Sequence, residues 1–303
     1  MSKKMRGLFD YEYQLELINK HQPPLAKLNN VIDWEMFRTP IEDAFTIEAK
    51  APGGRPPFDR LMMFKILILQ RYYNLSDEQT EFQIKDRLSF MQFLGLQIGD
   101  NVPDQKTIWY FKEQLKEKKL SKKLFELFTQ TLISNGVVAK EGSIVDASFV
   151  NVPRQRNTRE ENETIKQDDI PESFENHPAK LSQKDTDARW MTKNSERHFG
   201  YKNHINADAV TKLITKFTTS SASLHDSQKL EELVNQHDNR LFADSAYRSD
   251  KIESYLWLKK CKSFVHEKAY RSRPLTYAQE RDNTVKCSSH SIRTASRKSF
   301  EQV

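Results

Sequence analysis

The sequence predicts an α/β protein with two domains, an all-helical one over residues 1–136 and a mixed-sheet one over residues 137–303. In the first, apolar residues recur three or four positions apart, which is the spacing of helices that bury one face. After Gly136 this spacing shortens, and runs rich in β-branched residues alternate with helical segments. Such an order favours a mixed sheet flanked by helices.

Four helices are expected toward the end of the first domain. One follows the break in Gly and Pro residues at 53–57. Ser76 is expected to cap the next, which Gly95 closes, and Asp104 the third, because their side-chain oxygens can accept unpaired backbone N–H groups. The fourth, residues 120–134, runs to a glycine suited to the position after a helix.

These short helices in succession resemble a helix-turn-helix arrangement. The exposed face of the third would present Lys106, Tyr110 and Lys112 to a groove of DNA. The alternative is a helical bundle whose polar faces are only solvated. We expect the first, so that the all-helical domain is a DNA-binding domain.

The second domain is expected to begin with a buried strand at residues 143–150, which contains Asp146. A tight turn would join residues 198–210 and 213–219 as an antiparallel pair. A short strand at residues 240–244 ends in an acid, Asp244. The remaining expected elements are helices at 226–235, 250–259 and from 275 onward, and a strand at 262–266.

A polar insertion separates the first strand from the others, over about residues 152–197. Phe174 and Trp190 are its main large apolar residues. A segment this polar cannot bury enough apolar surface to form a core. We therefore expect a long, partly disordered loop.

The composition bounds the class of protein. A net charge of +6 and a pI near 9 favour a polyanionic partner without naming it. Cys261 and Cys287 form no close-spaced pair, which argues against a zinc clamp or a disulfide framework. The apolar stretch 61–69 is too short to cross a membrane, and no secretory signal is visible. We expect a cytoplasmic protein in a reducing compartment.

The two acids on apolar strands are the first candidates for chemistry. An unpaired carboxylate amid apolar residues is costly to bury, so Asp146 and Asp244 each need a cation or a strong donor. Singly, each is a paired structural aspartate or a turn cap. On neighbouring strands of one sheet, they would share a divalent ion such as Mg²⁺ or Mn²⁺. Asp226 is the alternative to Asp244 as the second acid, but its position before an expected helix fits an N-cap better.

Several short motifs occur in an order that resembles a known family. Their order and spacing are similar to those of the bacterial DDE transposases of the insertion sequence 5 family, over roughly residues 30–285. The motifs are Gly54-Arg55-Pro56-Pro57-Phe58-Asp59, Val145-Asp146-Ala147-Ser148, Asp185-Thr186-Asp187-Ala188-Arg189-Trp190, His198-Phe199-Gly200-Tyr201-Lys202, Ser223-Leu224-His225-Asp226-Ser227 and Phe242-Ala243-Asp244-Ser245-Ala246-Tyr247-Arg248-Ser249.

The resemblance implies a ribonuclease H-like catalytic domain that nicks DNA and transfers strands with two Mg²⁺ or Mn²⁺ ions. Asp146 would be the first metal-binding acid and Asp244 the second. Lys202 and Arg248 would lie near phosphates, the alternative being ordinary surface charges. The implied partners are double-stranded element ends and target DNA, bound by a homodimer associated with the nucleoid, with no membrane involved.

The third acid of the resemblance would be Glu301, four positions after Arg297. Residues 287–296 fit the family pattern poorly, which suggests a truncated or frame-disturbed copy. Three rival functions follow: an inactive remnant that only binds DNA, a metal-dependent nuclease that does not join strands, and a helix-turn-helix regulator. The last leaves the acids on the strands unexplained.

The end of the sequence is rich in positive charge, which would suit a phosphate backbone beside a metal site. Tyr270 and Tyr277 could stack on unpaired bases. Trp257 is expected to pack in the core instead.

Overall fold

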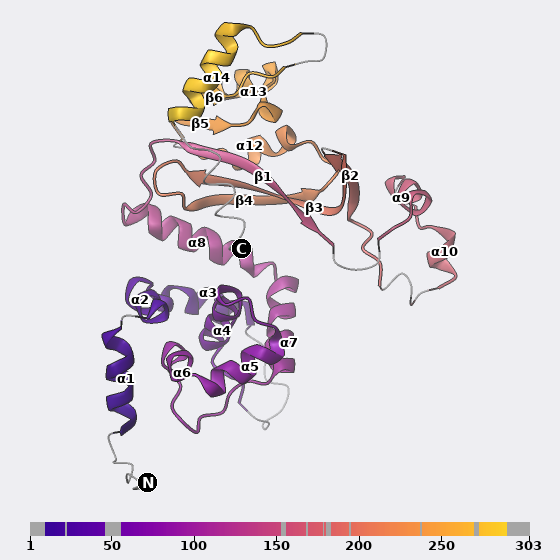
Figure 1. Ribbon diagram of the computed structural model, residues 1–303. Coiled ribbons are helices and arrows are strands. Elements are labelled where there is room, and N and C mark those ends of the chain that lie inside the picture. The colour runs from indigo at the N-terminus through magenta and orange to yellow at the C-terminus, as the bar shows by residue number, and fades with distance from the viewer. Residues whose placement is uncertain are drawn as a thin grey trace, which may run out of the picture. The chain divides into compact units, whose positions relative to one another are not determined.

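The computed structural model describes residues 10–21, 23–45, 56–152, 156–167, 169–177, 179, 183–193, 195–236, 238–269 and 273–289 (Figure 1). The chain divides into two compact units, Met1–Phe128 and Thr129–Val303. Glu301, Arg297 and Tyr270 lie outside the described residues. The described part of the chain contains no helix that is long and apolar enough to cross a membrane.

The first unit is helical throughout its described residues. Its core gathers apolar residues of the helices from α2 to α8, including Ile41, Ile66, Ile84 and Ile108. The helices are α1 Asp10–Lys20, α2 Pro24–Val31, the 3₁₀ turn η1 Trp34–Phe37, α3 Arg38–Phe45, α4 Arg60–Tyr72, α5 Asp77–Asp86, α6 Leu88–Leu94, α7 Gln105–Glu117, and α8 Leu120–Ser134, which continues into the second unit.

The expected helix caps are confirmed. Ser76 and Gln79 form a reciprocal capping box at the start of α5, and Asp104 accepts the Thr107 N–H at 2.7 Å at the start of α7. The segment from Ser76 to Gly95 is, however, two helices rather than one. Arg87 adopts an extended conformation between α5 and α6, which turns the second helix so that its apolar face also reaches the core.

The second unit is built on a six-stranded mixed sheet in the order β2-β3-β1-β5-β6, with β4 paired to β3. Strand β1 is antiparallel to β3 and parallel to β5, which is parallel to β6. The expected strands and the antiparallel pair are confirmed. The strands are β1 Ser143–Asn151, β2 Arg189–Lys193, β3 Glu196–Asp208, β4 Ile214–Ser221, β5 Arg240–Ala243 and β6 Lys262–Val265.

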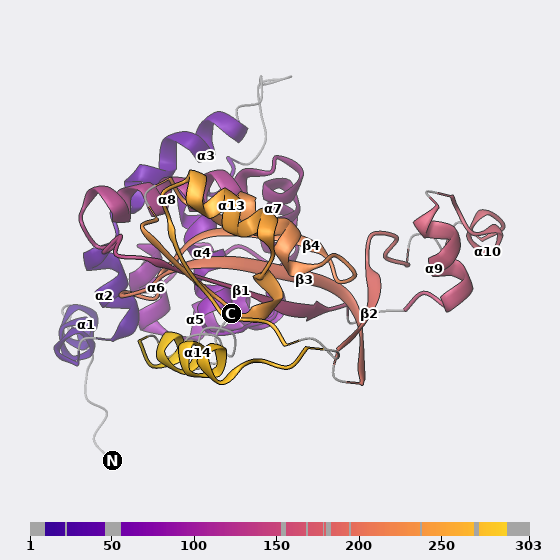
Figure 2. The same ribbon diagram turned by 90° about the horizontal axis from the view of Figure 1, so that it is seen from above.

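Both faces of this sheet are covered where the parallel strands lie. Val145, Ala243 and Val265 belong to one core cluster, whereas Phe242 and the adjacent Phe264 belong to the opposite one, as the alternation of a strand requires. In Figure 2 the sheet runs between α13 and α14. The helices of this unit include α12 Leu230–Leu233, α13 Asp250–Leu258 and α14 Tyr277–Ser289, with the 3₁₀ turns η2 Asp226–Lys229 and η3 Ser245–Tyr247.

The prediction that the insertion lacks a core is wrong for its described residues. It contains α9 Arg159–Lys166 and α10 Glu172–Glu175, and then β2, which extends the sheet. Phe174 is fully buried, and the ion pair between Lys184 and Glu161 leaves side chains only 6% and 9% exposed. Paired polar groups, together with one large aromatic residue, form a small core that an apolar count alone does not predict.

The prediction that Trp257 packs in the core is also wrong, because the side chain is 78% exposed. Ile252 and Leu256, four positions apart, form the buried face of α13. Trp257 follows Leu256 directly and therefore points away from that face.

Gly200 lies where β3 is paired on both edges, with Asn151 of β1 on one and Arg189 of β2 on the other. Its φ is +151°, and a Cβ there would lie 2.2 Å from the Val150 carbonyl oxygen. We predict that Gly200→Ala destabilises the protein by about 2–4 kcal/mol, measured by denaturant unfolding.

The matched control is Gly136→Ala, at φ +70° with nothing within 4 Å of the added Cβ. It should cost only about 1 kcal/mol, the conformational penalty of that region for an L-residue. Equal losses for the two variants would contradict the steric account of Gly200.

Candidate active site

The parallel pairing of β1 with β5 places two acids side by side. The last paired residues are Ile144 with Phe242 and Val145 with Ala243. The next residue of each chain is Asp146 and Asp244. Because neighbouring strands lie about 4.8 Å apart, the two carboxylates lie side by side at the point where β5 ends and β1 continues.

Asp146 has an environment that opposes its negative charge. Its pKa is raised chiefly by burial and further by Asp244 and Asp226, against a hydrogen bond of 2.8 Å from the Ala147 N–H and the charge of Lys193, both of which lower it. A carboxylate in this position gains from any additional cation. Lys193, which sequence reasoning did not single out, is exposed and belongs to β2.

Asp244 is exposed and caps the η3 turn, accepting the Ala246 N–H at 2.9 Å. This hydrogen bond fixes the direction of one carboxylate oxygen just beyond the end of β5. The backbone thus holds both acids through a short N–H contact, at Ala147 for one and Ala246 for the other.

The end of the next strand, β6, adds His266 to this group. Ala243 pairs with Val265 of β6, so His266 follows its strand as Asp244 follows β5, and its N–H donates to the Ala243 carbonyl at 3.2 Å. Burial lowers the pKa of His266, as does Lys286, whereas Asp244 raises it. The sequence signal was the equivalent position of this histidine after a short apolar strand.

Asp226 is not the N-cap that was expected. His225 caps η2 by accepting the Ser227 N–H, while Asp226 forms an ion pair of 2.7 Å with Lys202 Nζ. Lys202 is only 2% exposed and also donates to the Leu224 carbonyl at 2.6 Å. The expected phosphate contact is therefore a buried lysine that holds Asp226 beside the acid site.

Tyr247 lies near the three carboxylates. It is fully buried at the end of η3, and its pKa is raised by burial and then by Asp226, Asp146 and Asp244. Turn η2, which begins with Asp226, contacts η3, so Asp226 lies in the same neighbourhood as Asp244 and Tyr247.

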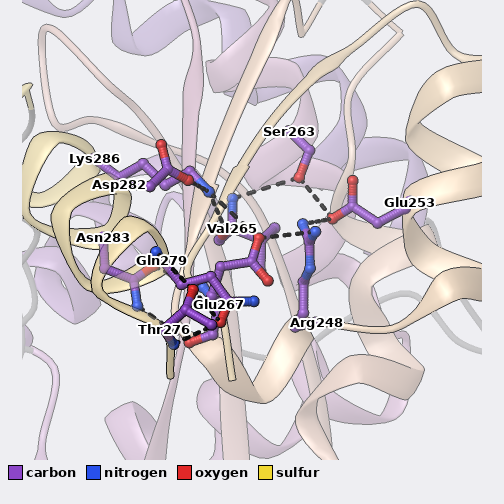
Figure 3. A network of polar contacts seen from close by, with 10 residues as sticks. All are labelled: Arg248, Glu253, Ser263, Val265, Glu267, Thr276, Gln279, Asp282, Asn283 and Lys286. Carbon is purple, nitrogen blue, oxygen red and sulfur yellow. Dashed lines mark hydrogen bonds and ion pairs between the residues drawn. The ribbon is translucent and has the colours of Figure 1, made fainter. Parts of the chain in front are cut away.

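Arg248 belongs to an ion-pair network that ties together β6, α13 and α14 (Figure 3). Its guanidinium contacts Glu253 at 2.6 Å and Glu267 at 2.9 Å. Glu267 is also bound through its backbone to Asn283, at 2.7 and 3.2 Å, and lies 3.9 Å from Lys286 Nζ. Arg248 thus has two carboxylate partners already, and it braces the turn that follows Asp244.

The predicted DNA-contacting residues of the first unit lie on α7. Lys106 and Tyr110 are exposed, whereas Ile108 and Phe111 point into the core. Lys112 is half-buried and forms an ion pair of 2.7 Å with Asp77 of α5. Two of the three side chains are therefore presented to solvent in the way a groove-binding face requires.

Carboxylates are suitable ligands for Mg²⁺ or Mn²⁺, so Asp146 and Asp244 fit a divalent ion by their chemistry and their mutual repulsion. Within the described ranges, no cluster of three or more His, Cys, Asp or Glu side chains is arranged to hold a metal ion. The fit is therefore that of a two-carboxylate site.

Comparison with known families decides the identity. A family model described as a transposase DDE domain matches residues 139–298, more than half of the chain, and includes Asp146 and Asp244. The chain belongs to the DDE transposases. A second model, described as a transposase domain (DUF772), matches residues 12–114 of this transposase. None of the solved structures matches it.

Membership gives the mixed sheet of this transposase a ribonuclease H-like fold and makes DNA its partner. Divalent metal ions are general in the family. The matched range includes Asp146 and Asp244 and ends before Glu301, and the metal-binding roles of all three acids stay predictions.

Asp146 and Asp208 should have opposite effects on stability. A raised pKa means that ionised Asp146 disfavours folding. The stability that the protonated carboxyl contributes is present below the unfolded pKa and is lost as pH rises through the folded pKa. Burial opposes the charge of Asp208 too, but hydrogen bonds from Thr211, Lys140 and Val210 outweigh it and lower its pKa. The stability that ionised Asp208 contributes is present above its unfolded pKa and is lost as pH falls through its folded pKa.

We therefore predict that, at pH 7 in a metal chelator, Asp146→Asn raises the melting temperature and Asp208→Asn lowers it. Differential scanning fluorimetry measures both. A melting temperature of Asp146→Asn below that of the unmodified protein would contradict this account of the acid site.

Proposed function

We propose that this transposase nicks the ends of an insertion sequence 5 family element and transfers the freed strands to target DNA. The observation that carries the proposal is the register of β1 and β5, which sets Asp146 beside Asp244. Both lie within the matched transposase domain. The strand pairing fixes their separation before any substrate arrives.

Asp146 and Asp244 would hold two Mg²⁺ or Mn²⁺ ions, which supply a Lewis acid for the attacking hydroxyl and the leaving oxygen. The protein's own part is to orient these carboxylates. The Ala147 and Ala246 N–H groups fix one oxygen of each, and the Lys202–Asp226 pair keeps a further carboxylate neutralised nearby. Glu301 is the proposed third ligand.

The helical unit would bind the terminal repeat through α7, with Lys106 on phosphate and Tyr110 at the groove. Lys112 would join them by exchanging Asp77 for a phosphate. In the second unit, Arg248 would contact a phosphate by releasing one of its glutamates. Because transposition joins two element ends, we propose that the chain acts as a homodimer on DNA.

One observation favours a second function. The described residues supply two neighbouring carboxylates, Asp146 and Asp244, but no third metal ligand arranged with them. A chain whose Glu301 does not complete the site would bind element ends without cutting them. In that case the protein is a catalytically inactive transposase that competes for the ends.

We predict that labelled duplex carrying the inverted repeats is nicked with Mg²⁺ or Mn²⁺, and that Asp146→Asn and Asp244→Asn each reduce the rate at least about a thousandfold. The control is Asp250→Asn, the same substitution at an exposed acid in the first turn of α13. Salt-sensitive binding of the repeats without nicking by the unmodified chain would favour the second function.

A separate prediction concerns α7. Lys106→Ala should weaken binding of the repeats and reduce the slope of log affinity against log salt by about 1, because one phosphate contact is lost. The control is Lys123→Ala on α8, which removes an equally exposed charge. Titration at several salt concentrations measures both, and equal slopes for the two variants would argue against α7 as the DNA-binding face.

A further inference from the structure

We propose that the Tyr247 hydroxyl is a positioning group of the acid site, which donates a hydrogen bond to a metal-binding carboxylate or to a metal-bound water. This inference rests on the proposed function, because it needs a divalent ion at Asp146 and Asp244. It goes beyond that function by assigning a role to a residue outside the set of acids.

The first observation is that the hydroxyl has nothing to bind. Tyr247 is 0% exposed, and its oxygen is buried without a hydrogen-bond partner among the described residues. A buried hydroxyl that has lost water and gained no partner costs free energy. Such groups call for a specific explanation, and an ion or ordered water that completes the site is one.

The second observation is that packing does not need the oxygen. The ring of Tyr247 belongs to the apolar cluster that includes Val145, Ala243 and Leu256. Phenylalanine would fill that space equally well. The oxygen is therefore retained for a polar purpose, or it is a net cost to folding.

The third observation is where the residue is placed. Asp244 is the N-cap of η3 and Tyr247 is its last residue, with the Tyr247 N–H donating to the Asp244 carbonyl at 3.2 Å. Turn η2, which carries Asp226, contacts η3. Val145, in contact with the same cluster, directly precedes Asp146. The ring thus lies between the elements that carry all three acids.

The chemistry of a phenol fits the role. A phenol has an ordinary pKa of about 10, so the Tyr247 hydroxyl is protonated at neutral pH and acts as a donor. Its acceptor would be a carboxylate oxygen of the acid site, and this hydrogen bond would fix the orientation of that carboxylate toward a cation. Groups that orient metal ligands in this way change metal affinity about 10- to 100-fold when they are removed.

The test is Mn²⁺ binding, measured by electron paramagnetic resonance on the full chain without DNA, together with the melting temperature in a chelator. We expect Tyr247→Phe to weaken Mn²⁺ binding about tenfold or more. The metal-free variant should melt at the same temperature or higher, because a buried, unpaired hydroxyl is gone. The control is Tyr255→Phe on α13, whose hydroxyl donates to the Glu231 carbonyl at 3.4 Å; it should leave Mn²⁺ affinity unchanged.

The outcomes separate the inference from the proposed function. Unchanged Mn²⁺ affinity in Tyr247→Phe, while Asp146→Asn abolishes binding, overturns the inference and leaves the metal site standing. A lower melting temperature of metal-free Tyr247→Phe also overturns it, because the hydroxyl would then have a structural partner. No Mn²⁺ binding by the unmodified chain removes both.

Discussion

The pairing of two short parallel strands is the constraint on which the acid site depends. Three residue pairs between β1 and β5 bring Asp146 beside Asp244 where β5 ends, and burial together with the charge of Asp244 raises the pKa of Asp146. A slip of one residue would send one side chain to the opposite face. The buried alternation of Val145 and Ala243 on one side and Ile144 and Phe242 on the other resists that slip.

Around this pair, the buried Lys202 and the half-buried Arg248 serve as supports rather than as free contacts. Lys202 neutralises Asp226 from the interior of β3, and Arg248 joins Glu253 and Glu267 behind the η3 turn. Removing one partner of a buried pair leaves an uncompensated charge, so such pairs hold their geometry firmly. The site therefore combines rigid surroundings with two neighbouring acids whose repulsion a bound cation relieves. Such a conflict between stability and function is common at active sites.

Local patterns were enough to predict most helices and strands and the positions of Asp146 and Asp244 on or directly after strands. An acid that interrupts an apolar strand is visible in the sequence, as at Asp146, and helix caps such as Ser76 depend only on their neighbours. The roles of Lys202, Tyr247 and His266 could not be predicted, because they depend on which strands and turns become neighbours. The predictions for Trp257 and for the insertion were wrong for a related reason. Burial is decided by packing partners, and a polar segment can form a small core when its charges are paired.

The account is tested most directly by diffraction from crystals of this transposase soaked in Mn²⁺, with the anomalous signal of the metal recorded. It predicts an anomalous peak bound by carboxylate oxygens of both Asp146 on β1 and Asp244 at the end of β5. Peaks found only elsewhere, or none where both side chains are well ordered, would contradict the claim that strand pairing builds a metal site.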